Sequence, residues 1–425
     1  MNLVEGFEAA SRALCRQSTG IAGEGGERES SVRSIIENVR RRGDNALFEY
    51  TEKFDKAKLD GLEVSNDLIS RACCDVAPSL LASLKMAADR IAAFHRIQLK
   101  AVETRVKSPG LSQIVRPLER VGVYVPGGTA SYPSTVLMTA VPARVAGVKE
   151  IILVTPPRPD GTVSPLVLAS AAVAGVDRVF AVGGAQAIAA LAFGTESIPR
   201  VDKICGPGNI YVTIAKKLVY GVVGIDGLAG PSEVLILADK SADPVYCAAD
   251  ILAQAEHDAM ASSILVTDSM QLAISVKREV ARQLKNTPRK EIAERSLNSG
   301  GIIAVVDSPE EMIELANAYA PEHLCLIVKK PAAYVKQLKN AGCIVTGKKA
   351  TVVIGDYIAG PSHVLPTGGT ARFSSPLNIL DFVKLTNVIE VNDAELKALG
   401  DAAGTIAEAE GFIAHAEAIR LRTNG

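Results

Sequence analysis

Short apolar segments alternate with glycine- and proline-containing turns and alanine-rich stretches from about residue 118 onward. The first series of expected strands covers Arg120–Val125, Glu150–Thr155, Arg178–Val182, Lys203–Cys205 and Glu233–Ala238. Alanine-rich segments of helical character, such as Pro165–Ala174 and Ala185–Phe193, follow several of these strands. Strand followed by helix, repeated about every 25 residues, predicts parallel βαβ units and an α/β layered fold.

A second series of the same kind follows, and helical segments flank the two series. Its expected strands are Ser263–Thr267, Gly301–Val306, Leu324–Val328, Cys343–Thr346 and Val352–Gly355. Helical spacing of apolar residues predicts helices over Ser30–Tyr50, Asn66–Cys74 and Ser79–Ala101, and a helical tail over Ala394–Arg422. His95, on the third of these helices, is expected to be a surface or partly packed histidine.

Composition and charge exclude several classes of function. The chain has 425 residues, enough for two or three globular units of about 150 residues each. Its 46 basic and 47 acidic residues are spread along the sequence, so we expect no nucleic-acid partner. No apolar stretch reaches the roughly 18 residues of a membrane span, and the first residues lack a signal-like apolar core. The seven scattered cysteines form neither a metal pattern nor a disulfide framework, so we expect a reducing, cytoplasmic compartment. We expect no association with a membrane.

Four glycine-rich turns lie at the ends of strands in the first series. They are Val125–Gly128, Val182–Gln186, Cys205–Asn209 and Ala229–Glu233. Glycine lets a ligand approach the backbone, and helix N-termini after such turns can hold phosphate oxygens. None is a complete G-x-G-x-x-G fingerprint, because Tyr211 stands where the turn at Gly206 would need its third glycine. Four such turns at strand ends favour nucleotide binding over ordinary turns.

Gln254 and His257 are the first candidate metal ligands. A helix is expected to start at Ser241–Pro244 and to continue to Ser262, with both side chains on one face. Two neutral donors on one helical turn can chelate a metal, and a simple polar helix face is the alternative.

Two further motifs combine a histidine with a carboxylate. Glu322 and His323 stand just before an expected strand, where they can move protons near neutral pH. Asp356 follows another expected strand, and a Gly-Pro loop separates it from His363. Exposed loop residues are the alternative in both cases.

The tail carries the last of these motifs, Glu410 and His415. On a regular helix five residues put these two side chains well apart in angle, unless Glu410 lies at a non-helical entry. With His415 included, four of the five histidines stand in motifs with a carboxylate, an amide or a Gly-Pro turn. Gln, His and Asp donors without cysteine suit zinc or a similar divalent ion.

Long motifs over nearly the whole chain resemble the histidinol dehydrogenase family. They read RVGVYVPGG, VGGAQAIAALAFGT, KICGPGN, GPSEVL, QAEHD, APEHL, GDYIAGPSHVLPTGG and EGFIAHA. The resemblance implies NAD-dependent oxidation of L-histidinol, through L-histidinal, to L-histidine, the last steps of histidine biosynthesis. It implies a zinc ion that chiefly positions the substrate.

The resemblance also implies a role for each residue of the site. His323 would be the general base of both steps, and Glu322 would activate the water that attacks the aldehyde. Zinc would be held by Gln254, His257, Asp356 and His415. Substrate would contact these four residues together with His323, Ser232, His363 and Glu410, and NAD would contact Tyr124, Gln186 and Asn209.

The family's fold implies two incomplete Rossmann-like domains with parallel sheets, small helical terminal segments and an intertwined homodimer. The boundaries expected here are an N-terminal arm over 1–18, a first domain over 19–123 and 233–370, and a second domain over 124–232. A tail over 371–425 would complete the partner's active site, so Glu410 and His415 would act across the interface.

Two other functions compete with this interpretation. A relative could oxidise another small primary alcohol with the same zinc and NAD, but its imidazole- and amine-binding positions would differ. A non-catalytic nucleotide- or metal-binding protein would not need the Glu322-His323 pair. A carboxylate beside the base also favours oxidation past the aldehyde, since water must first add to that aldehyde.

Overall fold

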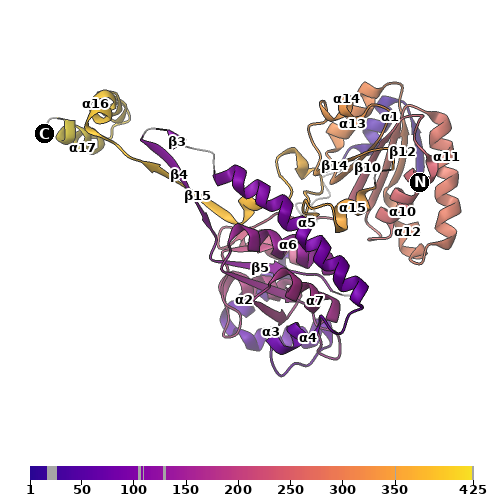
Figure 1. The fold of residues 1–425 in the computed structure, drawn as a ribbon, viewed down its shortest axis with the longest axis horizontal. Coiled ribbons are helices and arrows are strands. Elements are labelled where there is room, and N and C mark those ends of the chain that lie inside the picture. The colour runs from indigo at the N-terminus through magenta and orange to yellow at the C-terminus, as the bar shows by residue number, and fades with distance from the viewer. Residues whose placement is uncertain (17–25, 104–106, 109, 128–130, 350, 424–425) are drawn as a thin grey trace. The chain divides into compact units, whose positions relative to one another are not determined.

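The computed structural model describes residues 1–16, 26–103, 107–108, 110–127, 131–349 and 351–423. Met1–Gln98 and Pro117–Phe382 together form one compact unit, and Leu99–Arg116 and Val383–Gly425 form a second, smaller one. Both units are seen as ribbons in Figure 1. The larger unit contains two six-stranded sheets, here named sheet A and sheet B.

Sheet B is a parallel sheet with one antiparallel edge strand. Its order is β2-β7-β6-β5-β8-β9. The strands are β2 (Glu63–Val64), β5 (Arg120–Tyr124), β6 (Glu150–Thr155), β7 (Arg178–Ala181), β8 (Lys203–Cys205) and β9 (Gly224–Ile225). Helices α6 (Pro133–Ala146), α7 (Pro165–Ala174), α8 (Gly184–Phe193) and α9 (Ile210–Val219) connect them. Strands are added to one side of β5 and then to the other, so the order reverses between β5 and β8.

The N-terminal helices belong to the core of sheet B. Helices α2 (Glu27–Arg42) and α3 (Asp44–Asp55) contact α8, and the buried side chains of Val32 and Leu47 join the cluster around Phe180. The sequence instead grouped residues 19–123 with 233–370 and expected one helix over Ser30–Tyr50. The apolar stripe of α2 packs on the helices that cover sheet B, and the helix breaks at Gly43, whose φ is +53°.

Sheet A repeats this arrangement with other residues. Its order is β1-β12-β11-β10-β13-β14, with all neighbours parallel. The strands are β1 (Asn2–Glu5), β10 (Glu233–Ala238), β11 (Ser262–Thr267), β12 (Gly301–Val305), β13 (His323–Ile327) and β14 (Cys343–Thr346). Every residue of β10 and β13 is buried, as expected for a parallel sheet covered on both faces.

Helices cover both faces of sheet A. One cluster packs α10 (Pro244–Ala255), α11 (Met270–Gln283) and α12 (Lys290–Gly300) on the sheet, and the other packs α1 (Phe7–Leu14) and α13 (Pro309–Tyr319). The expected N-terminal arm is therefore part of this domain, because β1 extends the sheet and α1 buries Ala10 and Leu14.

Two expected elements of sheet A were wrong. Val352–Gly355 is not a strand but the start of helix α15 (Val352–Tyr357), because the Thr351 side chain caps it by accepting from the Val353 N–H. Helix α10 stops at Ala255 and does not reach Ser262. Shorter elements are α4 (Asn66–Arg71), α14 (Pro331–Val335), η1 (Leu284–Asn286), η2 (Thr370–Arg372) and η3 (Ile379–Asp381).

The long helix α5 (Pro78–Glu103) agrees with the expected helix over Ser79–Ala101, but its histidine does not. His95 is fully buried, and its Nδ1 lies 2.8 Å from the carbonyl oxygen of Ile91. The imidazole can be buried because one of its nitrogens is hydrogen-bonded to the backbone of its own helix. The amphipathic spacing alone had predicted a surface or partly packed position. Among the described residues, no helix is long and apolar enough to cross a bilayer.

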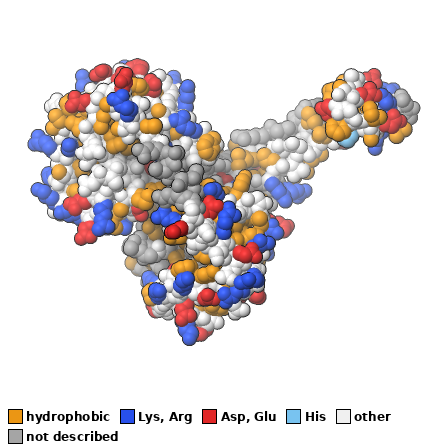
Figure 2. Space-filling model, turned by 180° about the vertical axis from the view of Figure 1, so that it is seen from behind, with side chains coloured by type: hydrophobic (Ala, Val, Ile, Leu, Met, Phe, Trp, Pro, Cys, Tyr) orange, Lys and Arg blue, Asp and Glu red, His pale blue; other side chains and the backbone are white. Residues whose placement is uncertain are grey.

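The smaller unit consists of a three-stranded sheet and two helices. The sheet has the order β15-β4-β3, from β3 (Lys107–Ser108), β4 (Leu111–Pro117) and β15 (Val383–Ile389). The expected tail helix is divided into α16 (Asp393–Ala409) and α17 (Ile413–Thr423) by Gly411, whose φ is +80°. Large apolar side chains are exposed on this unit, among them Ile389, Leu399, Ile406, Ile413 and Leu421. Hydrophobic side chains are visible on the tail in Figure 2.

We expect Leu47→Ala to lower the free energy of unfolding by about 2–5 kcal/mol, because it leaves a cavity where α3 meets sheet B. Urea denaturation measures the loss. Leu68→Ala, at an exposed position on α4, is the control and should change stability by no more than about 0.5 kcal/mol. Equal effects of both variants would contradict the packing of α3 in this core.

Candidate active site

The pairing of β10 with β13 brings three of the expected site residues together. Val234 is opposite His323 in this parallel ladder, so Ser232, Glu322 and His323 all lie at the amino-terminal edge of sheet A. The sequence expected Glu322 and His323 just before a strand, and β13 begins at His323. The polar groups of sheet A thus gather at the edge where β10 and β13 begin.

Glu322 is buried and held by the neighbouring strand. Its Oε2 accepts a hydrogen bond from the Glu233 N–H at 2.7 Å, and its Oε1 lies 4.0 Å from His323 Nε2. Burial raises the pKa of Glu322 well above its usual range, and the nearby carboxylates of Glu233 and Asp356 add to this rise. The side chain is thus a carboxyl group poised to exchange a proton.

His323 is the neutral imidazole of this cluster. Burial lowers its pKa to about 3, and the adjacent His363 and His257 contribute. Its Nε2 lies 3.4 Å from Asp356 Oδ1, and its Nδ1 is buried without a hydrogen-bond partner among the described residues. A neutral imidazole with a free nitrogen can accept a proton near neutral pH.

Asp356 and His363 lie next to this pair, as the sequence expected, but Asp356 comes from helix α15 instead of a strand end. Burial raises the pKa of Asp356 to about 7, with a contribution from Asp250. His363 Nδ1 lies 2.7 Å from the backbone oxygen of Asp356, and its Nε2 lies 3.4 Å from Thr135 Oγ1. Burial lowers the pKa of His363 to about 4.

Gln254 and His257 flank the C-terminal end of α10. Gln254 is in the last turn of the helix, while His257 is in the turn that follows, with its N–H donating to the Gln254 carbonyl at 3.2 Å. Gln254 is buried, and its amide nitrogen has no partner among the described residues. His257 is exposed, although the surrounding protein still desolvates it and lowers its pKa.

Gln254 and Asp356 have the chemistry of cation ligands, but the expected ligand set is divided between the two units. An amide without a partner can turn its oxygen toward the site, and Asp356 is a buried carboxylate that a positive charge would stabilise. Among the described residues, however, no group of three or more His, Cys, Asp or Glu side chains is gathered tightly enough to hold a metal. Gln254 is an amide, and the fourth expected ligand, His415, belongs to the smaller unit.

Glu410 and His415 are both exposed on the smaller unit. Glu410 is the C-cap residue of α16, outside the helix that carries His415, which is the non-helical position that the sequence required. The His415 ring lies 5.2 Å from that of Phe412, between centroids. Both side chains are therefore open to another surface.

The expected cofactor residues lie at the carboxyl edge of sheet B. Tyr124 ends β5, Gln186 is in the first turn of α8, and Asn209 caps α9 with its side-chain oxygen. The buried Tyr124 hydroxyl accepts a hydrogen bond from the Gly184 N–H at 3.1 Å, and burial raises its pKa to about 12. Two helix N-termini thus face this edge, as nucleotide phosphates require. Gly128 of the first turn lies outside the described residues.

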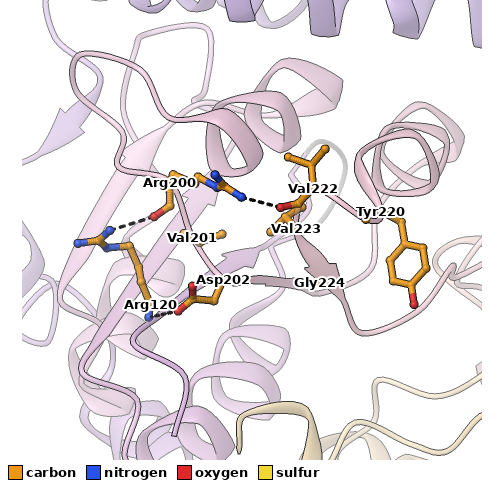
Figure 3. Close-up of a pocket in the computed structure, with 9 residues that line it drawn as sticks. Arg120, Arg200, Val201, Asp202, Tyr220, Val222, Val223 and Gly224 are labelled. Atoms are coloured by element: carbon orange, nitrogen blue, oxygen red, sulfur yellow. Dashed lines mark hydrogen bonds between the residues drawn. The ribbon is translucent and has the colours of Figure 1, made fainter. Parts of the chain in front are cut away.

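A hollow lies at the other edge of sheet B, and hydrogen bonds join several of the residues that line it (Figure 3). Arg200 donates to the Val222 carbonyl at 2.8 Å, Arg120 donates to the Arg200 carbonyl at 2.9 Å, and Asp202 accepts from the Arg120 N–H at 3.0 Å. These bonds tie the strand starts together, and we interpret the hollow as structural.

Comparison with known proteins decides the family. The family model described as histidinol dehydrogenase matches residues 22–423. The chain belongs to the histidinol dehydrogenase family. It is 55% identical over 434 aligned positions to the histidinol dehydrogenase of Dehalococcoides mccartyi strain CBDB1, covering 99% of this chain and 100% of that protein. It is 50% identical over 399 positions to that of a Synechococcus species, covering 93% and 92%.

A solved structure agrees. The histidinol dehydrogenase of Elizabethkingia anophelis superposes with a TM-score of 0.94 at 36% identity, covering 100% of this chain and 98% of that one. The α/β fold with parallel-sheet domains is therefore confirmed. The family is one of NAD-dependent oxidoreductases of histidine biosynthesis that use a zinc ion.

Two features near the site have no signal in the sequence. Arg16 pairs with the buried Glu233, and its Nε donates to the Tyr319 carbonyl at 2.9 Å, although 217 residues separate the two charges. Asp55, at the end of α3, has a buried Oδ2 without a partner among the described residues and lies near Tyr124. An acidic residue at the end of an amphipathic helix is usually solvated, so no local pattern distinguishes it.

Asp55→Asn should stabilise the protein at high pH. Burial raises the pKa of Asp55 from 3.8 to about 6, so its ionised form costs stability above pH 6, and the cost disappears below about pH 4. We expect a gain of about 1–2 kcal/mol at pH 8, reduced from the full linkage value for partial exposure, and none at pH 4. Urea denaturation at both pH values measures it, with the exposed Asp60→Asn as control. A gain independent of pH would contradict the assignment.

Proposed function

We propose that the chain oxidises L-histidinol through L-histidinal to L-histidine at the amino-terminal edge of sheet A, using two NAD molecules in succession. The observation that carries this proposal is the buried pair of Glu322 and His323, with Asp356 3.4 Å from the imidazole. A base and a separate carboxyl group side by side match a reaction with both an alcohol and an aldehyde step.

In the first step His323 accepts the hydroxyl proton of histidinol while a hydride passes from the carbinol carbon to NAD. The products are the aldehyde, NADH and a proton. Burial keeps the imidazole of His323 uncharged, and its Nδ1 has no partner among the described residues, so a ring nitrogen is available for this proton. A base already protonated at neutral pH could not take the proton.

In the second step Glu322 takes a proton from water as the water oxygen bonds to the aldehyde carbon, which gives the gem-diol monoanion. His323, having released its first proton, accepts the remaining hydroxyl proton, and a second NAD would take the hydride, which leaves the carboxylate. One proton is then on Glu322 and one on His323. The raised pKa of Glu322 makes its carboxylate a stronger base than an ordinary one.

We infer that Gln254, His257, Asp356 and His415 would hold the zinc ion. Bound there, it would fix the imidazole and amine of the substrate. Ser232, His363 and Glu410 would complete the substrate contacts. Gln254 supports this inference, because its buried amide lacks a partner among the described residues.

NAD is proposed to bind at the carboxyl edge of sheet B, against Tyr124, Gln186 and Asn209. The reversal of strand order between β5 and β8 supports this site, because open α/β sheets bind ligands where the order reverses. Both sheets share this order, which supports a description as two incomplete Rossmann-like domains, one for catalysis and one for the cofactor.

We also propose a homodimer in which the tail of one subunit completes the site of its partner. Exposed Ile389, Ile406 and Leu421 give the smaller unit an apolar surface, and exposed Glu410 and His415 are free to reach another chain. None of the seven cysteines, all of which lie among the described residues, is in a disulfide, which is compatible with the cytoplasm that the sequence predicts.

Glu322→Gln and His323→Asn should separate the two steps. We expect His323→Asn to slow oxidation of both histidinol and histidinal by about 10²–10⁴-fold. Glu322→Gln should slow histidinal oxidation by about 10²-fold or more and histidinol oxidation to histidinal far less. Single-turnover NADH formation from each substrate measures this, with Glu314→Gln on the surface of α13 as control. Equal losses in both steps for Glu322→Gln would contradict its role.

Mixing two inactive variants tests the shared site. Subunits with His415→Ala and subunits with His323→Asn, unfolded and refolded together, should regain up to about one quarter of the parent activity, since mixed dimers hold one intact site. Each variant refolded alone should stay inactive. No recovery in verified mixed dimers would show that each site is built from one chain.

A further inference from the structure

A buried ion pair lies beneath the glycine turn that follows β8. Lys216 on α9 is paired through its Nζ with Asp226 Oδ1, directly after β9. Their side chains are only 3% and 4% exposed. A buried ion pair adds little net stability compared with apolar residues of similar size. We therefore interpret its role from the backbone groups that Lys216 and Asp226 also bind.

Two of the hydrogen bonds of this pair converge on Gly206. The Gly206 N–H donates to Asp226 Oδ2 at 2.7 Å, and Lys216 Nζ donates to the Gly206 carbonyl at 2.9 Å. The pair therefore holds both backbone groups of one residue. Asp226 Oδ1 also accepts from the Gly227 N–H at 2.7 Å, which fixes the carboxylate itself.

The backbone at position 206 accommodates only glycine. Its φ is +109°, and an added Cβ would lie 2.2 Å from the Tyr124 carbonyl oxygen. The turn thus packs on the end of β5 at the point where the strand order of sheet B reverses. Through its hydroxyl, Tyr124 also receives the Gly184 N–H of the neighbouring turn.

We propose that Lys216 and Asp226 are positioning residues for NAD. They fix the backbone of the Gly206–Asn209 turn in the position at which it would contact the cofactor. The inference rests on the proposed cofactor site at Tyr124, Gln186 and Asn209. Lys216 does not act as a phosphate-binding charge, because it is buried and neutralised by Asp226. Its effect on the cofactor passes through the backbone of the turn.

The test is a double-mutant cycle of Lys216→Met, Asp226→Asn and the two combined. We expect each single variant to raise the Kd for NAD, measured by calorimetry, by about tenfold or more, and the double variant to bind no worse than the weaker single one. The Kd for histidinol should change less than about twofold, since the substrate is bound at sheet A. Should a single variant fail to fold, the double variant, which leaves no unpaired buried charge, still gives the answer.

Two outcomes would overturn the proposal. One is a folded double variant that binds NAD within twofold of the parent. The other is a loss confined to Lys216→Met with Asp226→Asn unchanged, which would make the lysine a direct contact. Arg144→Met is the control, because it breaks the Arg144–Asp177 pair at the amino-terminal edge of sheet B, opposite the proposed cofactor site, and should leave NAD affinity unchanged.

Asn209→Asp separates this inference from the cofactor site itself. Aspartate keeps the oxygen that caps α9 but removes the amide donor and adds a negative charge. If Asn209→Asp binds NAD as well as the parent, the proposed cofactor site is wrong. If it loses NAD affinity while the double variant does not, only the role of Lys216 and Asp226 is wrong.

Discussion

The parallel pairing of β10 with β13 is the interaction on which the candidate site depends. It sets Val234 opposite His323, and the residues just before each strand follow from that register. The Glu233 N–H then reaches the Glu322 carboxylate, and His323 turns its Nε2 toward Asp356. A shift of one residue in this ladder would reverse the facing of every side chain and break the hydrogen bond from the Glu233 N–H to Glu322.

The two sheets have the same strand order but use opposite edges. Sheet B presents helix N-termini and glycine turns at its carboxyl edge, where the positive ends of helix dipoles suit a dinucleotide. Sheet A presents buried ionisable side chains at its amino edge, where helix α10 ends and strand β13 begins. Desolvation there lowers the pKa of His323 and raises that of Asp356, so burial favours the neutral form of both groups.

Much of this could be predicted from the sequence. Most strand positions were confirmed, because short apolar runs bounded by glycine turns usually form buried strands. The long motifs identified the family. The strand at Val352 was wrong because the Thr351 cap outweighs β-branched propensity. The packing of α2 on sheet B, the burial of His95 and the pairing of Arg16 with Glu233 depend on residues far apart in the chain. The zinc ligands and NAD contacts stay predictions from the resemblance, since His415 lies in the smaller unit.

The number of NADH molecules formed per histidinol consumed tests the account most directly. A base and a water-activating carboxyl group in one buried site predict two NADH per histidinol, with histidine as the product and no free aldehyde accumulating. A yield of one, with histidinal as the end product, would contradict the role given to Glu322 and reduce the chain to an alcohol dehydrogenase.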